Sequence, residues 1–118
     1  MLLALQLLNL LEDAGADDTT PDQFTFADRF NVATSAEITS DPVTVTGIDA
    51  AAAITVTGGT YSINGAAFTA DPGTVVNGDA VRARHTSSGS ASTATNTAVT
   101  IGGVSDTFTS TTAGAANP

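Results

Sequence analysis

The sequence of 118 residues contains no cysteine, no tryptophan and no lysine. Without cysteine the chain forms no disulfide, no thiolate metal site and no cysteine nucleophile. Its only basic residues are three arginines, which with 12 acidic residues give a net charge of -9. Because this charge repels phosphate groups, the sequence disfavours nucleic acids and anionic membrane surfaces as partners. A single histidine gives no cluster for zinc, and no apolar run reaches transmembrane length.

Between Pro42 and Thr69 the sequence alternates apolar residues with threonine or serine in three short segments. A period of two places the apolar side chains on one face of a β-sheet and the hydroxyl side chains on the other. Asn64-Gly65 predicts a tight hairpin turn, because both residues of such a turn need a positive φ. The alternating apolar pairs are Val43 and Val45, Ile54 and Val56, and Tyr61 and Ile63.

The same alternation with turn residues continues to residue 111 and predicts an all-β, Ig-like antiparallel β-sandwich of about seven strands. The absence of a Cys–Trp–Cys set excludes an antibody-type domain. Over 29–40 the pattern is poor, and Val32, Ala36 and Ile38 indicate a loop that returns into a strand. A connector is expected over 50–53. The first strand is expected to start at Phe24 and Phe26, and the others to lie at Val43–Thr46, Ile54–Thr57, Thr60–Ile63, Ala66–Thr69, Ala80–Ser87, Thr93–Ile101 and Val104–Thr111.

Residues of the same parity on these strands define the predicted core. On the strand that begins at Ala80, the apolar parity contains His85, whereas Arg82 and Arg84 fall on the opposite face. The predicted core residues are Phe24, Phe26, Val43, Val45, Ile54, Val56, Ile63, Val81, Val99, Ile101 and Phe108.

The first thirteen residues, MLLALQLLNLLED, predict a short N-terminal α-helix that is apolar except for a narrow stripe of Gln6, Asn9 and Glu12. This segment has three interpretations. It is a secretory signal, a helix packed on the chain's own sandwich, or a helix that docks into a partner or bundles with copies of itself. The absence of early basic residues argues against a signal. Two seams of coiled-coil spacing favour the third interpretation. The predicted partner-binding residues are Leu2, Leu3, Leu5, Leu7, Leu8, Leu10 and Leu11.

We divide the chain into an anchoring helix over 1–13, an acidic linker over 14–22, the β-sandwich over 23–112 and a C-terminal tail over 113–118. The linker contains Asp17, Asp18 and Asp22. These residues lack the spacing and the turn glycine of a calcium-binding loop, so a solvated linker is the better interpretation.

From Asp18 to Thr112 the sequence resembles a recurrent bacterial Ig-like repeat. The resemblance rests on the segments DTTPDQFTF, PVTVTGID, AAITVTGGTYSINGAAFT, GTVVNGDAVRAR and ATNTAVTIGGVSDTF. It implies a spacer or adhesive module of large bacterial surface proteins, of a kind also appended to virion proteins of tailed phages, and it transfers no catalytic role. The chain departs from it at His85 and Ser110, where an apolar residue is expected, and in its leucine-rich helix.

His85 is the one candidate for a catalytic base. A nucleophilic site would need a serine and a carboxylate beside it, and Ser87 and Asp79 are near it in sequence. No nucleophile-elbow pattern surrounds these residues, and most other acids fall in turns, their ordinary place. We therefore predict no catalytic residue, no cofactor and no metal site. Arg82 and Arg84 are expected to pair with neighbouring acids, or else to receive an acidic partner or a sugar.

Two functional interpretations follow. In the first, the chain is a structural or accessory protein of a tailed-phage virion (capsid decoration, head fibre or tail accessory protein), assembled in the host cytoplasm and docked by its helix onto virion proteins or copies of itself. In the second, it is a carbohydrate- or surface-binding adhesive module of a bacterial surface protein. The leucine helix and the single domain favour the first. The two are compatible, because a displayed domain can bind host glycans weakly in many copies.

Overall fold

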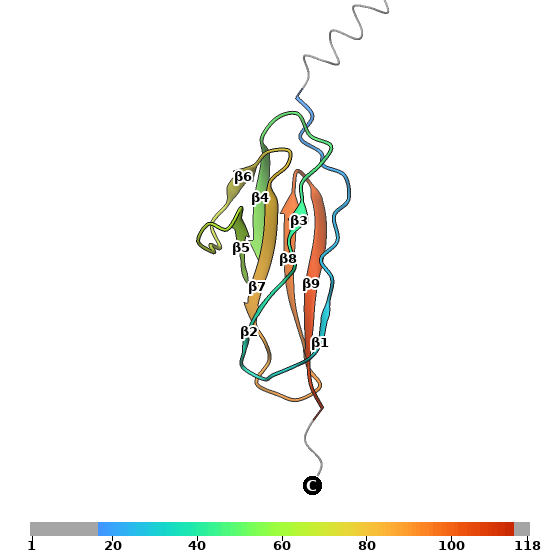
Figure 1. Cartoon of the computed structure of the whole chain (residues 1–118), viewed down its shortest axis with the longest axis vertical. Coiled ribbons are helices and arrows are strands. Elements are labelled where there is room, and N and C mark those ends of the chain that lie inside the picture. Colours follow the sequence, from blue (N-terminus) through green and yellow to red (C-terminus); the bar gives the residue numbers. More distant parts are fainter. Residues whose placement is uncertain (1–16, 115–118) are drawn as a thin grey trace, which may run out of the picture.

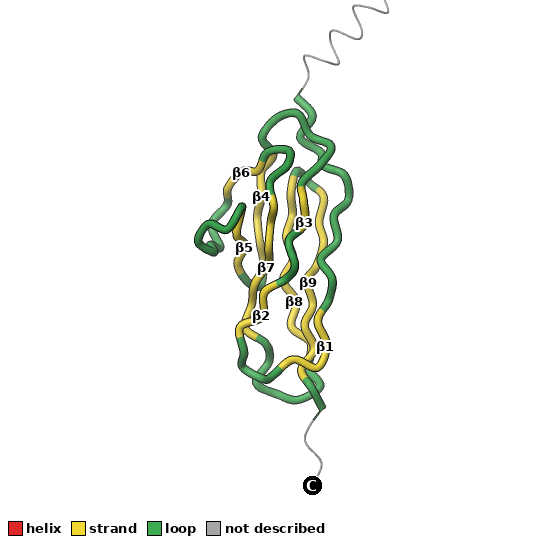
Figure 2. The backbone as a smooth tube through the Cα atoms, in the orientation of Figure 1, coloured by secondary structure: helices red, strands yellow, loops and turns green. Residues whose placement is uncertain are grey.

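The computed structural model describes residues 17–114, and the helix expected over 1–13 lies outside the described residues. The described part forms two β-sheets that pack against each other (Figure 1 and Figure 2). No helix occurs within 17–114. The strands are β1 (Arg29–Val32), β2 (Glu37–Thr39), β3 (Val43–Thr44), β4 (Ala52–Thr57), β5 (Thr60–Ile63), β6 (Gly73–Val75), β7 (Ala80–Thr86), β8 (Ala94–Ile101) and β9 (Val104–Thr112).

The larger sheet contains five strands in the order β1-β9-β8-β4-β6. In the smaller sheet β7 is the central strand, with β2 and then β3 along one edge and β5 along the other. All pairings are antiparallel except that of β1 with β9, which is parallel. The all-β, sandwich-like architecture predicted from the sequence is confirmed, although nine strands form where about seven were expected.

The core lies between the two sheets and follows the predicted parity on most strands. Three predicted core residues, Val43, Val56 and Ile63, are only partly buried and pack against the cluster from its margin. Ile48, Ala52, Tyr61, Val75 and Ala83 belong to the cluster although they were absent from the predicted core. The predicted residues that are buried are Phe24, Phe26, Val45, Ile54, Val81, Val99, Ile101 and Phe108.

The segment with Phe24 and Phe26 is not the strand that the sequence predicted. Both rings do point inward: they contact edge to face at 5.8 Å, and Phe26 lies 6.5 Å from the Phe108 ring. The backbone N–H of Phe26, however, donates to the Asp106 carboxylate at 2.8 Å. The N–H of Thr109 on β9 donates to the Asp28 carboxylate at 3.1 Å. Because carboxylates take the place of backbone carbonyls in these bonds, the segment packs beside β9 without forming a ladder.

The Asn64-Gly65 turn forms as predicted, with positive φ values of 53° and 80°. The strand expected after it, Ala66–Thr69, does not form, and only an isolated bridge between Tyr61 and Thr69 remains. The Ser62 hydroxyl donates to the Ala66 carbonyl at 2.6 Å, which closes the chain into a loop over the edge of β5. The connector expected over 50–53 is also shorter than predicted, because β4 already begins at Ala52.

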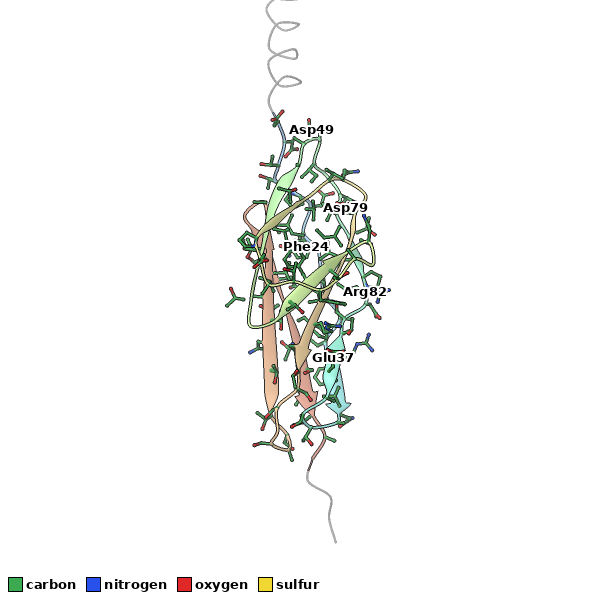
Figure 3. All side chains as sticks on the ribbon, turned by 90° about the vertical axis from the view of Figure 1, so that its left-hand side faces the viewer. Phe24, Glu37, Asp49, Asp79 and Arg82 are labelled. Atoms are coloured by element: carbon green, nitrogen blue, oxygen red, sulfur yellow. The ribbon has the colours of Figure 1, made fainter. Side chains whose placement is uncertain are left out.

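The two ends of the described chain lie at opposite ends of the sandwich (Figure 1). Asp18 is fixed beside the loop between β3 and β4: its N–H donates to the Asp49 carboxylate at 2.6 Å and its carbonyl accepts from the Asp49 N–H at 3.0 Å. Figure 3 shows Asp49 at this end of the molecule and Glu37 toward the other. The described chain therefore begins at one end of the sandwich, where Asp18 is bonded to the loop between β3 and β4.

Two substitutions on β4 test this assignment of the core. Ile54 is completely buried, so Ile54→Ala should lower the free energy of unfolding by about 2–5 kcal/mol. Val56, two residues along the same strand, is partly exposed, and Val56→Ala should cost less than half as much. Urea denaturation of both variants measures the difference, and equal losses would contradict the placement of these side chains.

Candidate functional site

The most unusual group in the core is the imidazole of His85, which carries hydrogen bonds on both ring nitrogens. His85 lies on β7 and is 6 % exposed. Its Nδ1 is 2.7 Å from the Thr97 hydroxyl on β8, and its Nε2 is 2.6 Å from the Ser110 hydroxyl on β9. The ring also stacks on Phe108 with its centroid 4.9 Å away. The imidazole therefore joins the smaller sheet to two adjacent strands of the larger sheet, β8 and β9.

The hydrogen-bond partners determine which nitrogen carries the proton. The Thr97 hydroxyl donates its single hydrogen to the Gly58 carbonyl at 3.0 Å, since a carbonyl can only accept. Thr97 must then accept from His85, which places the proton on Nδ1. Nε2 is left as an acceptor, and the Ser110 hydroxyl donates to it. A directed relay results, from Ser110 through His85 and Thr97 to the Gly58 carbonyl.

The Ser110–His85 contact has the polarity of a nucleophile and its base, but Ser110 is 0 % exposed and no substrate reaches its oxygen in this conformation. The third residue of the relay is Thr97, whose hydroxyl takes the place of the carboxylate found in a catalytic triad. Within residues 17–114 no hydrogen bond joins a carboxylate to the ring. The relay is suited to holding the two sheets together, and the absence of catalysis stays a prediction.

The two residues considered as partners of His85 lie elsewhere. Ser87 donates to the Ala33 carbonyl at 2.6 Å and accepts from the Ala36 N–H at 2.9 Å, so it fixes the connection between β1 and β2. Asp79, at the opposite end of β7, accepts from the Val76 N–H at 2.8 Å and stabilises a turn. Sequence proximity was misleading because a strand rises about 3.3 Å per residue, which separates Ser87 and Asp79 from the His85 ring along the length of β7.

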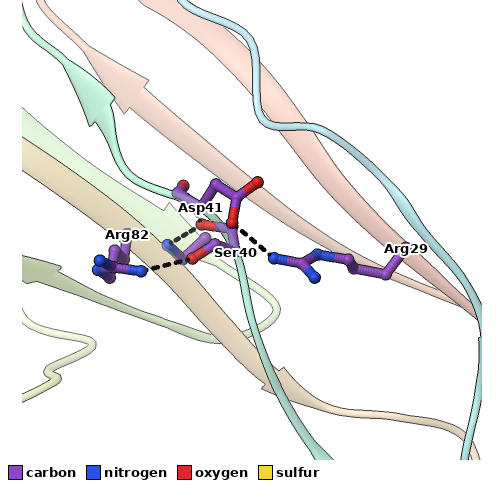
Figure 4. A network of polar contacts seen from close by, with 5 residues as sticks. Arg29, Ser40, Asp41 and Arg82 are labelled. Atoms are coloured by element: carbon purple, nitrogen blue, oxygen red, sulfur yellow. Dashed lines mark hydrogen bonds and ion pairs between the residues drawn. The ribbon is translucent and has the colours of Figure 1, made fainter.

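Two of the arginines, Arg29 and Arg82, bind the connection between β2 and β3. Arg29 on β1 forms an ion pair with Asp41 at 2.8 Å, and the Nη1 of Arg82 donates to the Ser40 carbonyl at 3.3 Å. Figure 4 shows Ser40 and Asp41, in the connection from β2 to β3, between these two arginines. The ion pair of Arg29 was not predicted. The pairing that was expected for Arg82 with a neighbouring acid is not found among residues 17–114, where its guanidinium is bound by a backbone carbonyl instead.

Arg84 is held by two neighbours at once. Its guanidinium lies 3.8 Å above the centre of the Phe68 ring, and its Nε is 3.4 Å from the Glu37 carboxylate. Phe68 belongs to the loop between β5 and β6, which the Tyr61 hydroxyl fixes by donating to the Asp71 carbonyl at 2.6 Å. The pairing predicted for Arg84 with a neighbouring acid is confirmed, and the stacking was not predicted.

A hollow of about 280 Å³ opens beside this arginine. It is bordered by Gly58, whose carbonyl ends the relay from His85, so the buried network lies next to an accessible surface. No aliphatic side chain lines it. The lining residues are Glu37, Gly58, Gly59, Thr60, Arg84, His85 and Thr86.

Sequence reasoning placed the functional residues at the other end of the chain. The seven leucines predicted to bind a partner lie outside the described residues. Thr97 and the hollow were missed, although one pattern pointed to the relay. Each of these three polar residues lies two positions from a buried apolar one: His85 from Ala83, Thr97 from Val99 and Ser110 from Phe108. Three such residues on strands that meet across a core predict a shared hydrogen-bond network.

Comparisons with protein-family models, curated proteins and solved structures gave no match. Across residues 17–114, no group of three potential metal-ligating side chains is found, and no helix is long and apolar enough to cross a membrane. The functional argument therefore depends on the geometry of the described residues and on the sequence of the rest.

The relay predicts a pH dependence of folding stability. Burial lowers the pKa of His85 below its usual value. Below about pH 6.5 the unfolded chain therefore takes up a proton that the folded chain does not. The stability gained from the neutral ring is complete above that pH and is lost as the pH falls toward the folded pKa. The slope is at most about 1.4 kcal/mol per pH unit.

Urea denaturation at several values between about pH 7.5 and 5.5 measures this slope. The His85→Gln variant serves as the control and should show little dependence on pH across the same interval. If both proteins had the same slope, the dependence would come from other groups.

Proposed function

We propose that the chain is a non-enzymatic structural or accessory protein of a tailed-phage virion, which docks through its N-terminal helix and displays an Ig-like β-sandwich. Capsid decoration, head fibre and tail accessory protein are the roles that fit this description. The proposal places the protein in the virion, with virion structural proteins or copies of itself as partners.

The strand order supports the Ig-like part of the proposal. In an immunoglobulin-type sandwich, strands B, E and D form one sheet and strands C, F and G the other. Here β7 lies between β2–β3 and β5, which corresponds to E between B and D. The larger sheet has β9, β8 and β4 in succession, which corresponds to G, F and C. The parallel β1 adds a strand beside G, and β6 adds one beside C.

The observation that carries the display function is the position of the two chain ends. Residues 17 and 114 lie at opposite ends of the sandwich (Figure 1). The reciprocal bonds between Asp18 and Asp49 fix Asp18 at one of these ends. A domain held by the segment that precedes Asp18 would therefore point its β1–β2 end, with Gly114, away from the attachment point.

The composition of residues 1–11 supports docking. A helix of about twelve residues is marginal in water alone, because its nucleation is costly. Seven leucines exposed together would form an apolar patch that soluble monomers rarely tolerate. Each buried leucine contributes about 1.5–3 kcal/mol, so burial of four or five offsets the ordering of the helix and holds the subunit in place.

The second candidate is an adhesive module of a bacterial surface protein that binds a carbohydrate or a surface. The hollow beside Arg84 favours it, because small ligands bind in concave sites that present a few polar groups. Against it, the chain has no tryptophan, and its one tyrosine, Tyr61, is buried at 2 % exposure. Tyr61 therefore offers no ring on which a sugar could stack.

A pair of double variants tests the docking helix. Leu7→Asp with Leu8→Asp should abolish both self-association and incorporation into particles, because it places two charges on the apolar surface. Gln6→Asp with Asn9→Asp adds the same charge on the polar stripe and should leave both unchanged. Light scattering and co-sedimentation with assembled particles measure the two properties.

A truncated chain that lacks residues 1–11 provides the second arm of this test. Its sandwich should keep dispersed amide resonances, while its assembly should be lost. Assembly of the truncated chain at full occupancy would show that the sandwich itself is the contact surface, and the proposal would then be wrong.

A further inference from the structure

We propose that the hollow beside Arg84 binds a carboxylate-bearing sugar unit, with the Arg84 guanidinium as the carboxylate contact. This site goes beyond the proposed docking function, because it is formed entirely by the sandwich and needs nothing from the N-terminal helix. Its parts come from β2, β7 and the turn between β4 and β5, which are far apart in the sequence and adjacent in the fold.

Arg84 is prepared to bind an anion. Stacking on Phe68 at 3.8 Å fixes the plane of the guanidinium, so little side-chain entropy is left to lose on binding. The Glu37 carboxylate lies 3.4 Å from the Nε. Among residues 17–114, the two Nη atoms make no hydrogen bond within the protein. They form a free edge with two parallel N–H donors, which is the geometry that binds a carboxylate through both oxygens.

The other lining residues select a hydrophilic ligand. The hollow of about 280 Å³ is far larger than a bare carboxylate group. Its side chains supply the hydroxyls of Thr60 and Thr86 and the carboxylate of Glu37, and none is aliphatic. A sugar ring with a carboxyl substituent presents hydroxyl groups to these donors and acceptors, whereas an acidic peptide would bring apolar atoms that find no partner.

Besides its ion pair with Arg84, Glu37 can contact the ligand. Its side chain is 64 % exposed, so the oxygens not needed by Arg84 can accept hydrogen bonds from ligand hydroxyls. The same charge prevents strong binding of simple anions, as does the net charge of -9. A single site should therefore bind in the millimolar range and become effective only when many copies are displayed together.

One wall of the hollow is rigid. The Gly58 carbonyl accepts from Thr97, which is bonded in turn to the His85 ring in the core. At Gly59 a Cβ would lie 2.5 Å from the Arg84 carbonyl and 2.6 Å from the Thr97 hydroxyl, so only glycine fits between these strands. The relay that joins the sheets therefore also holds this wall in place. Gly58 and Gly59 do not have to become ordered when a ligand binds.

Titration of the full chain with glucuronic acid, followed by amide resonances, tests the site. We expect saturable shifts at Gly58, Gly59 and Thr86, and binding at least roughly tenfold weaker for the methyl ester of the same sugar. Arg84→Gln should weaken binding of the acid by at least roughly tenfold. Arg82→Gln is the matched control, since Arg82 lies on the same face of β7 outside the hollow, and should change the affinity less than about twofold.

Three results would overturn the proposal: no saturable shift with the acid, equal affinity for the acid and its ester, or equal affinity for acetate, which would indicate a bare carboxylate site. If Arg84→Gln disturbs the fold, Thr86→Asp replaces it. This variant adds a negative charge at the rim without touching the guanidinium and should also weaken binding by roughly tenfold. The Leu7→Asp, Leu8→Asp variant should bind the sugar as the unmodified chain does, so the docking proposal and this one fail separately.

Discussion

The structure depends on keeping one buried imidazole neutral and fully hydrogen-bonded. An unpaired polar group in the core would cost about 1–3 kcal/mol, so His85 requires hydroxyl partners on the facing sheet. Thr97 and Ser110 supply them from β8 and β9, and Phe108 packs on the ring. In a chain without cysteine, this relay is a specific polar connection between the sheets. It also reaches the surface, because its last acceptor, the Gly58 carbonyl, borders the hollow beside Arg84.

The parts of the fold that local chemistry determines were predictable from the sequence. Alternation along β7 correctly placed Val81 and His85 inward, and the Asn64-Gly65 turn adopts the positive φ values that its residues favour. The sequence could not show that the segment of Phe24 and Phe26 packs inward without becoming a strand. Its bonds to β9 use the carboxylates of Asp106 and Asp28 rather than backbone carbonyls, and only the tertiary structure brings these residues together. The hollow escaped prediction for the same reason, since three separate segments form it.

Charge is distributed unevenly over the sandwich, and this bears on function. The outward residues of β8 and β9 carry no charge: they are Ala94, Asn96, Ala98 and Thr100, and Ser105, Thr107, Thr109 and Thr111. Arg82 and Arg84 lie on the outer face of β7, in the smaller sheet. The smaller sheet therefore holds the ligand-binding chemistry that we propose. The proposed attachment comes from the sequence before Asp18, and Asp18 itself is bonded to Asp49 at one end of the sandwich. The two functions would therefore occupy different parts of the molecule.

The tautomer of His85 tests the central claim most directly, and the chain has no second histidine to complicate the spectrum. Long-range proton–nitrogen correlation in the imidazole distinguishes the two ring nitrogens. At neutral pH the relay predicts a protonated Nδ1 and an unprotonated Nε2, because Thr97 accepts from the ring and Ser110 donates to it. A proton on Nε2, or rapid exchange between the two tautomers, would show that the directed connection between the sheets does not exist.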